Sequence, residues 1–114
     1  MARQRMPSSL PSAVERRELL FGRESLKTDH GAMAARYQEQ GRLTDALEFY
    51  AKAGDEAGVD EIRRAAVKDG DAFLLAQVVR VTGKPVDAAT WRETALAAER
   101  NEKLLFAITA FREA

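Results

Sequence analysis

The sequence predicts an all-α protein of about seven helices, in which consecutive helices form antiparallel hairpins. Three observations predict this class. Alanine is frequent, while the 114 residues contain only 7 Gly and 3 Pro. Apolar residues recur at intervals of three and four, and no segment alternates as a half-buried strand would. Several glycines directly follow such a stretch, where a left-handed residue ends a helix. The connections are short, which makes sequential helices antiparallel neighbours.

The N-terminal segment predicts an arm followed by the first helix. Residues 1–11 contain two prolines and paired serines, which favour a flexible arm, and we expect a single domain over residues 12–114. Ser12 belongs to the residue types that cap helices, so a helix is predicted over about 13–22.

The next two helices are predicted by residues at their ends and by their apolar spacing. They cover about 29–40 and the stretch between Thr44 and Gly54. The boundary residues are Thr28 or Asp29, Gly41, Thr44 and Gly54. In the second of these helices the small and apolar residues share one side, because they are spaced by three and four. They are Ala46, Leu47, Tyr50 and Ala53.

Four further helices are predicted in the second half, and most begin after an acidic residue. A helix begins at Asp55 or Asp60 and ends at Gly70, and another covers 72–82 between Asp71 and Gly83. The valine-rich run 78–81 has some strand propensity, but the Asp start and the Gly end favour a helix. Asp87 begins a helix through about Arg100, and Asn101 is predicted to cap the last helix.

Two of these helix pairs share a spacing of small and aromatic residues. The first series is Ala34, Tyr37, Ala46, Tyr50 and Ala53, and the last is Ala95, Ala98, Ala107, Phe111 and Ala114. The steps are identical in both series. This spacing resembles the tetratricopeptide repeat, in which small residues let two antiparallel helices cross closely while aromatic residues fill the gaps beside them. The resemblance implies a right-handed superhelix of stacked hairpins.

The middle pair, at about 56–82, departs from this pattern. It is shorter than the family's repeat and has no aromatic residue where one is needed. A related alternative is therefore the irregular helical-hairpin solenoid of coat and trafficking proteins, whose units resemble residues 34–55 equally well.

The resemblance also implies a partner groove on the first helix of each pair. The basic residues that it places there are Arg63, Arg64, Lys68, Arg92 and Arg100. We expect this groove to bind an acidic peptide. The clamp of Lys and Asn with which chaperone-binding members hold a terminal carboxylate is absent, because Gly31 and Ala35 occupy the first two of its positions.

The last helix predicts a surface for self-association. Leu104, Ala107, Ile108 and Phe111 form one stripe, whereas Leu105 and Phe106 lie on another side of the helix. No polar capping helix follows them, so Leu105 and Phe106 are candidates for contact with another chain and the protein is a candidate homo-oligomer. Alternatively, the middle pair covers them.

The residues that catalysis usually requires are scarce. The chain has no Cys and a single histidine, His30, which we expect to serve packing or capping. The carboxylate pairs lie at predicted helix ends, and no glycine-rich motif cradles a phosphate. We therefore expect no catalytic residues, no metal or cofactor site and no enzymatic activity.

The net charge and the hydropathy of the sequence limit the classes of partner that we expect. The formal net charge is zero, which argues against a dedicated nucleic-acid binder. No apolar run is long enough to span a membrane, and we expect a cytoplasmic protein. The favoured function is a non-catalytic protein-interaction module or scaffold. The alternative is a nucleic-acid-associated accessory protein using residues 1–28, which contain six basic and three acidic residues.

Overall fold

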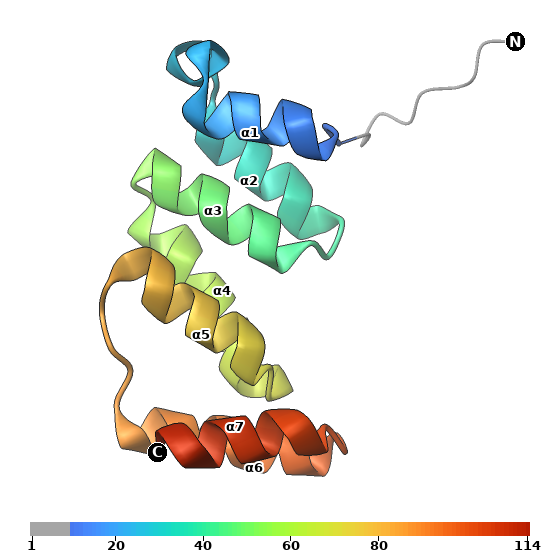
Figure 1. The fold of residues 1–114 in the computed structure, drawn as a ribbon, viewed down its shortest axis with the longest axis vertical. Helices are drawn as coiled ribbons and strands as arrows, with labels where there is room; N and C mark the ends of the chain where they lie inside the picture. Colours follow the sequence, from blue (N-terminus) through green and yellow to red (C-terminus); the bar gives the residue numbers. More distant parts are fainter. Residues whose placement is uncertain (1–9) are drawn as a thin grey trace, which may run out of the picture. The chain divides into compact units, whose positions relative to one another are not determined.

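The computed structural model describes residues 10–114, and this part of the chain contains seven α-helices and no strand (Figure 1). The predicted all-α class is therefore confirmed. The predicted arm over 1–11 lies, except for its last two residues, outside the described residues. In chain order the elements are α1 (Ala13–Phe21), the 3₁₀ helix η1 (Arg23–Lys27), α2 (His30–Glu39), α3 (Leu43–Ala53), α4 (Glu56–Asp69), α5 (Ala72–Thr82), α6 (Ala88–Arg100) and α7 (Leu104–Glu113).

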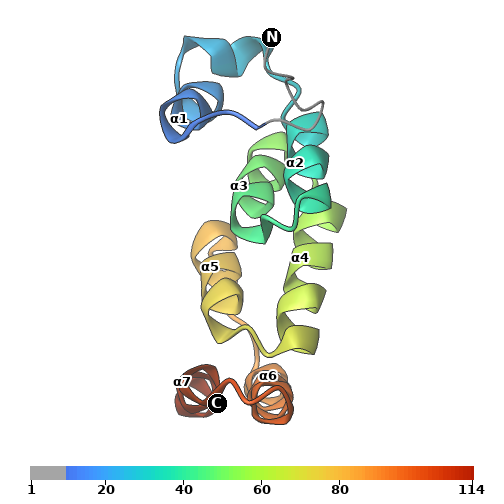
Figure 2. The same cartoon turned by 90° about the vertical axis from the view of Figure 1, so that its right-hand side faces the viewer.

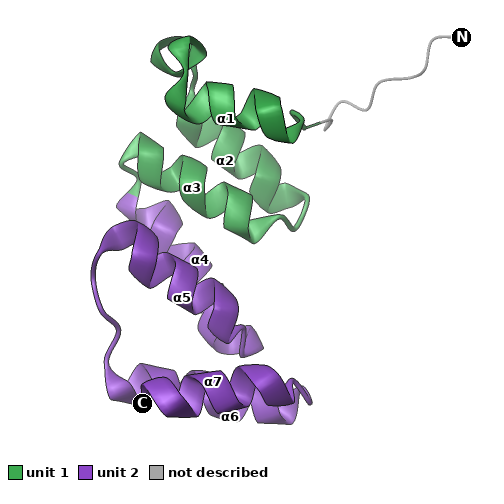
Figure 3. Cartoon of the chain, viewed as in Figure 1, with its two compact units in different colours: residues 1–55 green, residues 56–114 purple. Residues whose placement is uncertain are grey.

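The chain divides into two compact units, which Figure 3 shows in different colours. Unit 1 ends at Asp55 and contains α1, η1, α2 and α3. Unit 2 begins at Glu56 and contains the other four helices. The expectation of one domain over residues 12–114 stays a prediction.

Four helices begin at the polar residues that the sequence predicted. The Ser12 hydroxyl accepts a hydrogen bond from the Glu15 amide at 3.2 Å, and the Glu15 carboxylate accepts one from the Ser12 amide at 2.8 Å. The carboxylates of Asp29, Asp71 and Asp87 each accept a hydrogen bond from the amide three residues further on, at 3.0, 2.9 and 2.8 Å. Each bond satisfies an amide that has no partner within its helix.

Two other predicted caps are wrong. Helix α3 begins at Leu43, so Thr44 lies inside the helix, and no side chain caps its start. The turn before it is held by its own backbone instead, with the Arg42 amide donating to the Tyr37 carbonyl at 3.0 Å. Asn101 ends α6 rather than capping α7, which begins at Leu104. The short helix η1 was not predicted.

The core of unit 1 is the hairpin of α2 and α3. Ala34 and Ala46 are fully buried, as expected for small residues where two helices cross. The Tyr37 ring stacks on the Phe49 ring, with 5.3 Å between their centroids and 20° between their planes. Tyr50 is also buried, so aromatic side chains fill the hairpin around its alanines.

Polar side chains join α1 and η1 to this hairpin at several points. His30 Nε2 lies 3.0 Å from the Leu19 carbonyl oxygen and 3.2 Å from the Ser25 hydroxyl. The Arg16 guanidinium pairs with two carboxylates of α3, Asp45 and Glu48. His30 thus has the structural role that the sequence predicts for it.

Unit 2 consists of two hairpins, α4–α5 and α6–α7. Helix α4 packs on α6, and α5 contacts α6 and α7; in Figures 1 and 2 the first hairpin crosses the second obliquely. The α4–α5 turn lies directly on the α6 backbone. A methyl group on Gly70, whose φ is +73°, would lie 2.2 Å from the Ala98 nitrogen. Asn101 Nδ2 and Lys103 Nζ donate to the Asp69 carbonyl at 3.2 and 3.0 Å, which holds this turn in place.

Candidate interaction surfaces

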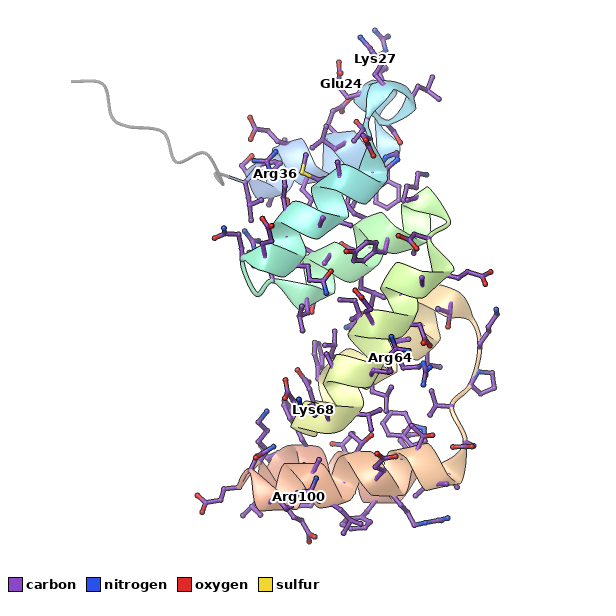
Figure 4. The ribbon with its side chains drawn as sticks, turned by 180° about the vertical axis from the view of Figure 1, so that it is seen from behind. Glu24, Lys27, Arg36, Arg64, Lys68 and Arg100 are labelled. Atoms are coloured by element: carbon purple, nitrogen blue, oxygen red, sulfur yellow. The ribbon has the colours of Figure 1, made fainter. Side chains whose placement is uncertain are left out.

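Three of the five predicted groove residues lie on one face of unit 2. Figure 4 labels them: Arg64 and Lys68 come from α4, and Arg100 comes from α6. All three side chains are exposed. Arg64 and Lys68 are four residues apart and therefore lie on the same side of their helix. The packing of α4 on α6 brings Arg100 onto the same face.

Asp60 neutralises part of the charge on α4. Arg63 bonds one of its carboxylate oxygens through two nitrogens, and Arg64 bonds the other. The hydrogen bond from Arg63 is the main reason why the pKa of Asp60 lies below its ordinary value, and the charges of both arginines add to the effect. Arg63 is also only half-exposed. This cluster therefore presents one net positive charge, carried mainly by the more exposed Arg64.

Arg92 lies apart from the other basic residues. It is in the first turns of α6, eight residues and about 12 Å of helix rise before Arg100. Its charge acts on Asp87 instead. Hydrogen bonds from Thr90 lower the pKa of the Asp87 carboxyl, and the positive charge of Arg92 lowers it further. The structure therefore does not gather all five predicted residues at one place.

Lys68 and Arg100 are both exposed and lie on the same face of unit 2. Within residues 10–114 neither side chain makes an ion pair. The Glu93 and Glu99 side chains are also exposed on α6, so the face is not uniformly basic. A ligand there meets separate positive charges on two adjacent helices rather than a continuous basic strip.

Most of the apolar stripe predicted on helix α7 is exposed. Three of the four stripe residues face outward: Leu104, Ile108 and Phe111 are 67, 53 and 44 % exposed. The buried residues of α7 are Ala107 and Ala110, and the helix that it packs on, α6, buries three alanines along with Trp91 and Thr94. Because α6 and α7 cross closely at these small residues, larger side chains do not fit between them.

The two candidate self-association residues differ in exposure. Leu105 is 78 % exposed, whereas Phe106 is half-buried. Phe106 is therefore the less accessible of the two for contact with another chain. The sequence indicated an unpartnered apolar surface on α7, but the direction of the buried face decides which residues form it.

Unit 1 contains a shallow hollow that the sequence did not predict. Its volume is about 470 Å³, and its lining residues are Leu10, Pro11, Glu15, Glu18, Leu19, Glu24 and Arg36. Figure 4 labels Glu24 and Arg36 at this place. Two of its three carboxylates accept hydrogen bonds from backbone amides, those of Ser12 and Glu24. These carboxylates hold the ends of α1, so we assign the hollow a structural role.

Metal-ligating side chains do not gather within residues 10–114. No three His, Asp or Glu side chains among them converge so that they could hold a metal ion. His30 is occupied by the Leu19 carbonyl and the Ser25 hydroxyl. In this same part of the chain no helix combines the length and the apolar character needed to cross a bilayer.

Comparison with known proteins found no match. No protein-family model, no curated protein and no solved structure matches this chain. The resemblance to tetratricopeptide repeats therefore rests on the residue spacing in the sequence.

Proposed function

We propose that this chain is a non-catalytic, cytoplasmic protein-interaction module of the tetratricopeptide-like kind, and that unit 2 binds an acidic peptide segment across α4 and α6. One observation carries the proposal. Lys68 and Arg100 project from two helices that pack together, and neither side chain has an ion-pair partner within residues 10–114. Exposed cations on adjacent helices are well placed to pair with carboxylates spaced along an extended peptide.

The packing order of unit 2 supports the repeat-like interpretation. The first helix of one hairpin, α4, packs on the first helix of the next, α6, while the second helices, α5 and α7, also contact each other. Stacked repeats bury their apolar faces in this order. The order also places the first helices side by side, which is what a peptide groove on them requires.

A peptide fits these charges better than a nucleic acid does. The chain has 18 basic and 18 acidic residues, and the basic N-terminal segment uses Arg16 internally, in pairs with Asp45 and Glu48. Arg3 and Arg5 lie outside the described residues. A nucleic-acid partner would be recognised by binding that weakens steeply with salt and does not depend on Lys68 or Arg100.

Selection from a random-peptide display library tests the proposal. The wild-type chain should enrich peptides rich in Asp and Glu, and the Lys68→Glu/Arg100→Glu variant should lose this enrichment. A synthetic peptide from the enriched set should bind the double variant at least about tenfold more weakly by fluorescence anisotropy, which corresponds to about 1.4 kcal/mol.

The matched control reverses two exposed lysines elsewhere. Lys27→Glu/Lys84→Glu changes the net charge by the same amount but leaves α4 and α6 intact. It should bind the selected peptide within about twofold of wild type, a difference of less than 0.5 kcal/mol. Equal losses in both double variants, or a wild-type selection with no acidic bias, would contradict the proposal.

A further inference from the structure

Helix α7 has an outer face of large apolar side chains that no other described residue covers fully. We define this outer face as Leu104, Leu105, Ile108 and Phe111, each of which is at least 44 % exposed. Leu104, Ile108 and Phe111 are spaced by four and three residues and therefore follow one line along the helix, and Leu105 flanks that line. The opposite side of the helix buries Ala107 and Ala110. Helix α7 is thus apolar on two sides.

The outer face is large enough to take part in a protein interface. Four large side chains, each with about half or more of its surface uncovered, present on the order of 400 Å² of apolar surface. That area lies within the range of about 300–600 Å² of the largest patch on a typical monomer, which is often functional. It is about half of the roughly 800 Å² that each partner buries in a standard interface, and the flanking polar residues can supply the rest.

The arrangement of the outer face fits a second copy of itself. Ile108 lies near its middle, with Leu104 four residues before it and Phe111 three residues after it. If two α7 helices pair in opposite directions about a two-fold axis at Ile108, the two Ile108 side chains meet. Each Leu104 then lies against the aromatic ring of the other copy's Phe111. A two-fold interface requires this kind of self-complementary surface.

The charges at the two ends of α7 favour the same arrangement. Glu102 is exposed just before the helix, and Arg112 is exposed in its last turn. Antiparallel pairing places the Arg112 guanidinium of one copy near the Glu102 carboxylate of the other, at both ends of the pair. Parallel pairing would place like charges together, which costs free energy. The helix dipoles are also opposed in the antiparallel arrangement.

We propose that this protein forms a homodimer in which the outer faces of two α7 helices pair antiparallel about Ile108. The surface differs from the one predicted by the sequence, because Phe106 is half-buried and Leu105 lies at the edge of the outer face. The dimer does not depend on the basic face of α4 and α6. It would, however, present two such faces in one particle, which raises the apparent affinity for a partner with two acidic segments.

The first experiment measures molecular mass by light scattering and sedimentation over a range of concentrations. Wild type should approach twice its chain mass of 12.6 kDa as the concentration rises. Ile108→Glu should remain at the single-chain mass over the same range, because it buries a carboxylate at the centre of the interface. The control is Leu26→Glu, which changes a 94 % exposed leucine in η1 and should dimerise as wild type does. Circular dichroism verifies that both variants keep the helical content of wild type.

The second experiment tests the centre of the interface with a thiol and the direction of pairing with exchanged charges, and neither part adds charge to the apolar face. The chain has no cysteine, so a single introduced thiol reports only on contact between two copies. Ile108→Cys should form a disulfide-linked dimer under mild oxidation, and Leu26→Cys should not. Arg112→Glu should weaken the dimer at least severalfold, and Glu102→Arg/Arg112→Glu should restore it.

Three outcomes would overturn the proposal. A wild-type chain that stays monomeric at every concentration would show that the outer face does not pair with a second copy. A dimer that persists in Ile108→Glu would place the interface elsewhere. Failure of the exchanged charges to restore dimerisation would reject antiparallel pairing.

Discussion

The first hairpin, α2–α3, and the last hairpin, α6–α7, carry the same spacing of small and aromatic residues but differ in what they enclose. Both bury alanines where their helices cross. The first hairpin also encloses Tyr37, Phe49 and Tyr50, whereas the corresponding aromatic of the last hairpin, Phe111, is 44 % exposed. The shared spacing is therefore compatible with buried alanines in both hairpins, but it does not fix which side of the second helix faces the core.

The difference has a physical cause in the composition of the two second helices. In α3 the buried side contains an alanine together with large side chains: Ala46, Leu47, Phe49 and Tyr50. In α7 the alanines at 107 and 110 form one side and the large residues form another. Because small residues let two helices approach closely, the alanine side of α7 packs inward in the hairpin with α6, which also buries alanines, and the large side of α7 remains exposed.

The largest expected effect comes from the turn that holds unit 2 together. In Gly70→Ala the new methyl group would lie 2.2 Å from the Ala98 nitrogen, at a φ of +73° that also strains any side chain. We expect the free energy of unfolding to fall by about 3–5 kcal/mol, measured by urea denaturation followed by circular dichroism.

Gly83→Ala is the matched control for this change. Gly83 has a similar φ of +70°, but a methyl group there would meet nothing within 4 Å. Its cost should be the backbone strain alone, about 1–2 kcal/mol. If the two variants lose equal stability, the close approach of the turn to α6 is not what holds the hairpins of unit 2 together.

The second prediction compares the aligned aromatics of the two hairpins directly. Tyr50→Ala removes a buried ring that also donates a hydrogen bond to Gln38, and should cost about 3 kcal/mol or more. Phe111→Ala removes a half-exposed ring and should cost less than about 1 kcal/mol in dilute protein, where association between copies is absent. Thermal denaturation of both variants measures the difference. Equal costs would show that the two hairpins enclose their aromatics alike.

The sequence predicted local structure well because local structure depends on neighbouring residues. The caps at Ser12, Asp71 and Asp87 and the helix ends at Gly54 and Gly83 all follow from side chains within a few positions. The two wrong caps, at Thr44 and Asn101, differ in origin. Before α3 the turn is closed by a backbone hydrogen bond from Arg42 to Tyr37. The Asn101 side chain instead donates to the Asp69 carbonyl, 32 residues away.

The candidate surfaces were harder to predict because they depend on side-chain direction and on distant partners. The residue types on α4 predicted a positive groove, but only the structure shows that Asp60 holds both Arg63 and Arg64. Likewise, the large residues of α7 were identified from the sequence, but their outward direction was not, because it depends on the small contact surface that α6 offers. Neither the oblique crossing of the two hairpins nor the contact of Gly70 with α6 has a sequence signature.

The smallest expected effect concerns a hydroxyl group in the core of the first hairpin. Tyr37 is fully buried and its hydroxyl oxygen has no hydrogen-bond partner within residues 10–114. Burying a hydroxyl without a hydrogen bond costs free energy, and Tyr37→Phe removes that cost. The ring of the variant stays stacked on Phe49. We expect the variant to be as stable as wild type at neutral pH, or more stable by up to about 1 kcal/mol.

Tyr50→Phe is the control, because the Tyr50 hydroxyl donates to Gln38 and its loss should cost about 1 kcal/mol.

Alkaline pH separates wild type from the Tyr37→Phe variant further. Burial, and secondly the negative charge of Asp45, raise the pKa of Tyr37 above its ordinary 10.0. The stability that protonated Tyr37 contributes is therefore fully present below pH 10.0, the ordinary pKa. It is lost as the pH rises through the higher pKa of the folded state. Tyr37→Phe should consequently lose less stability than wild type when the pH is raised past that point. A marked loss of stability in Tyr37→Phe at neutral pH would instead mean that the hydroxyl has a partner, such as a bound water molecule.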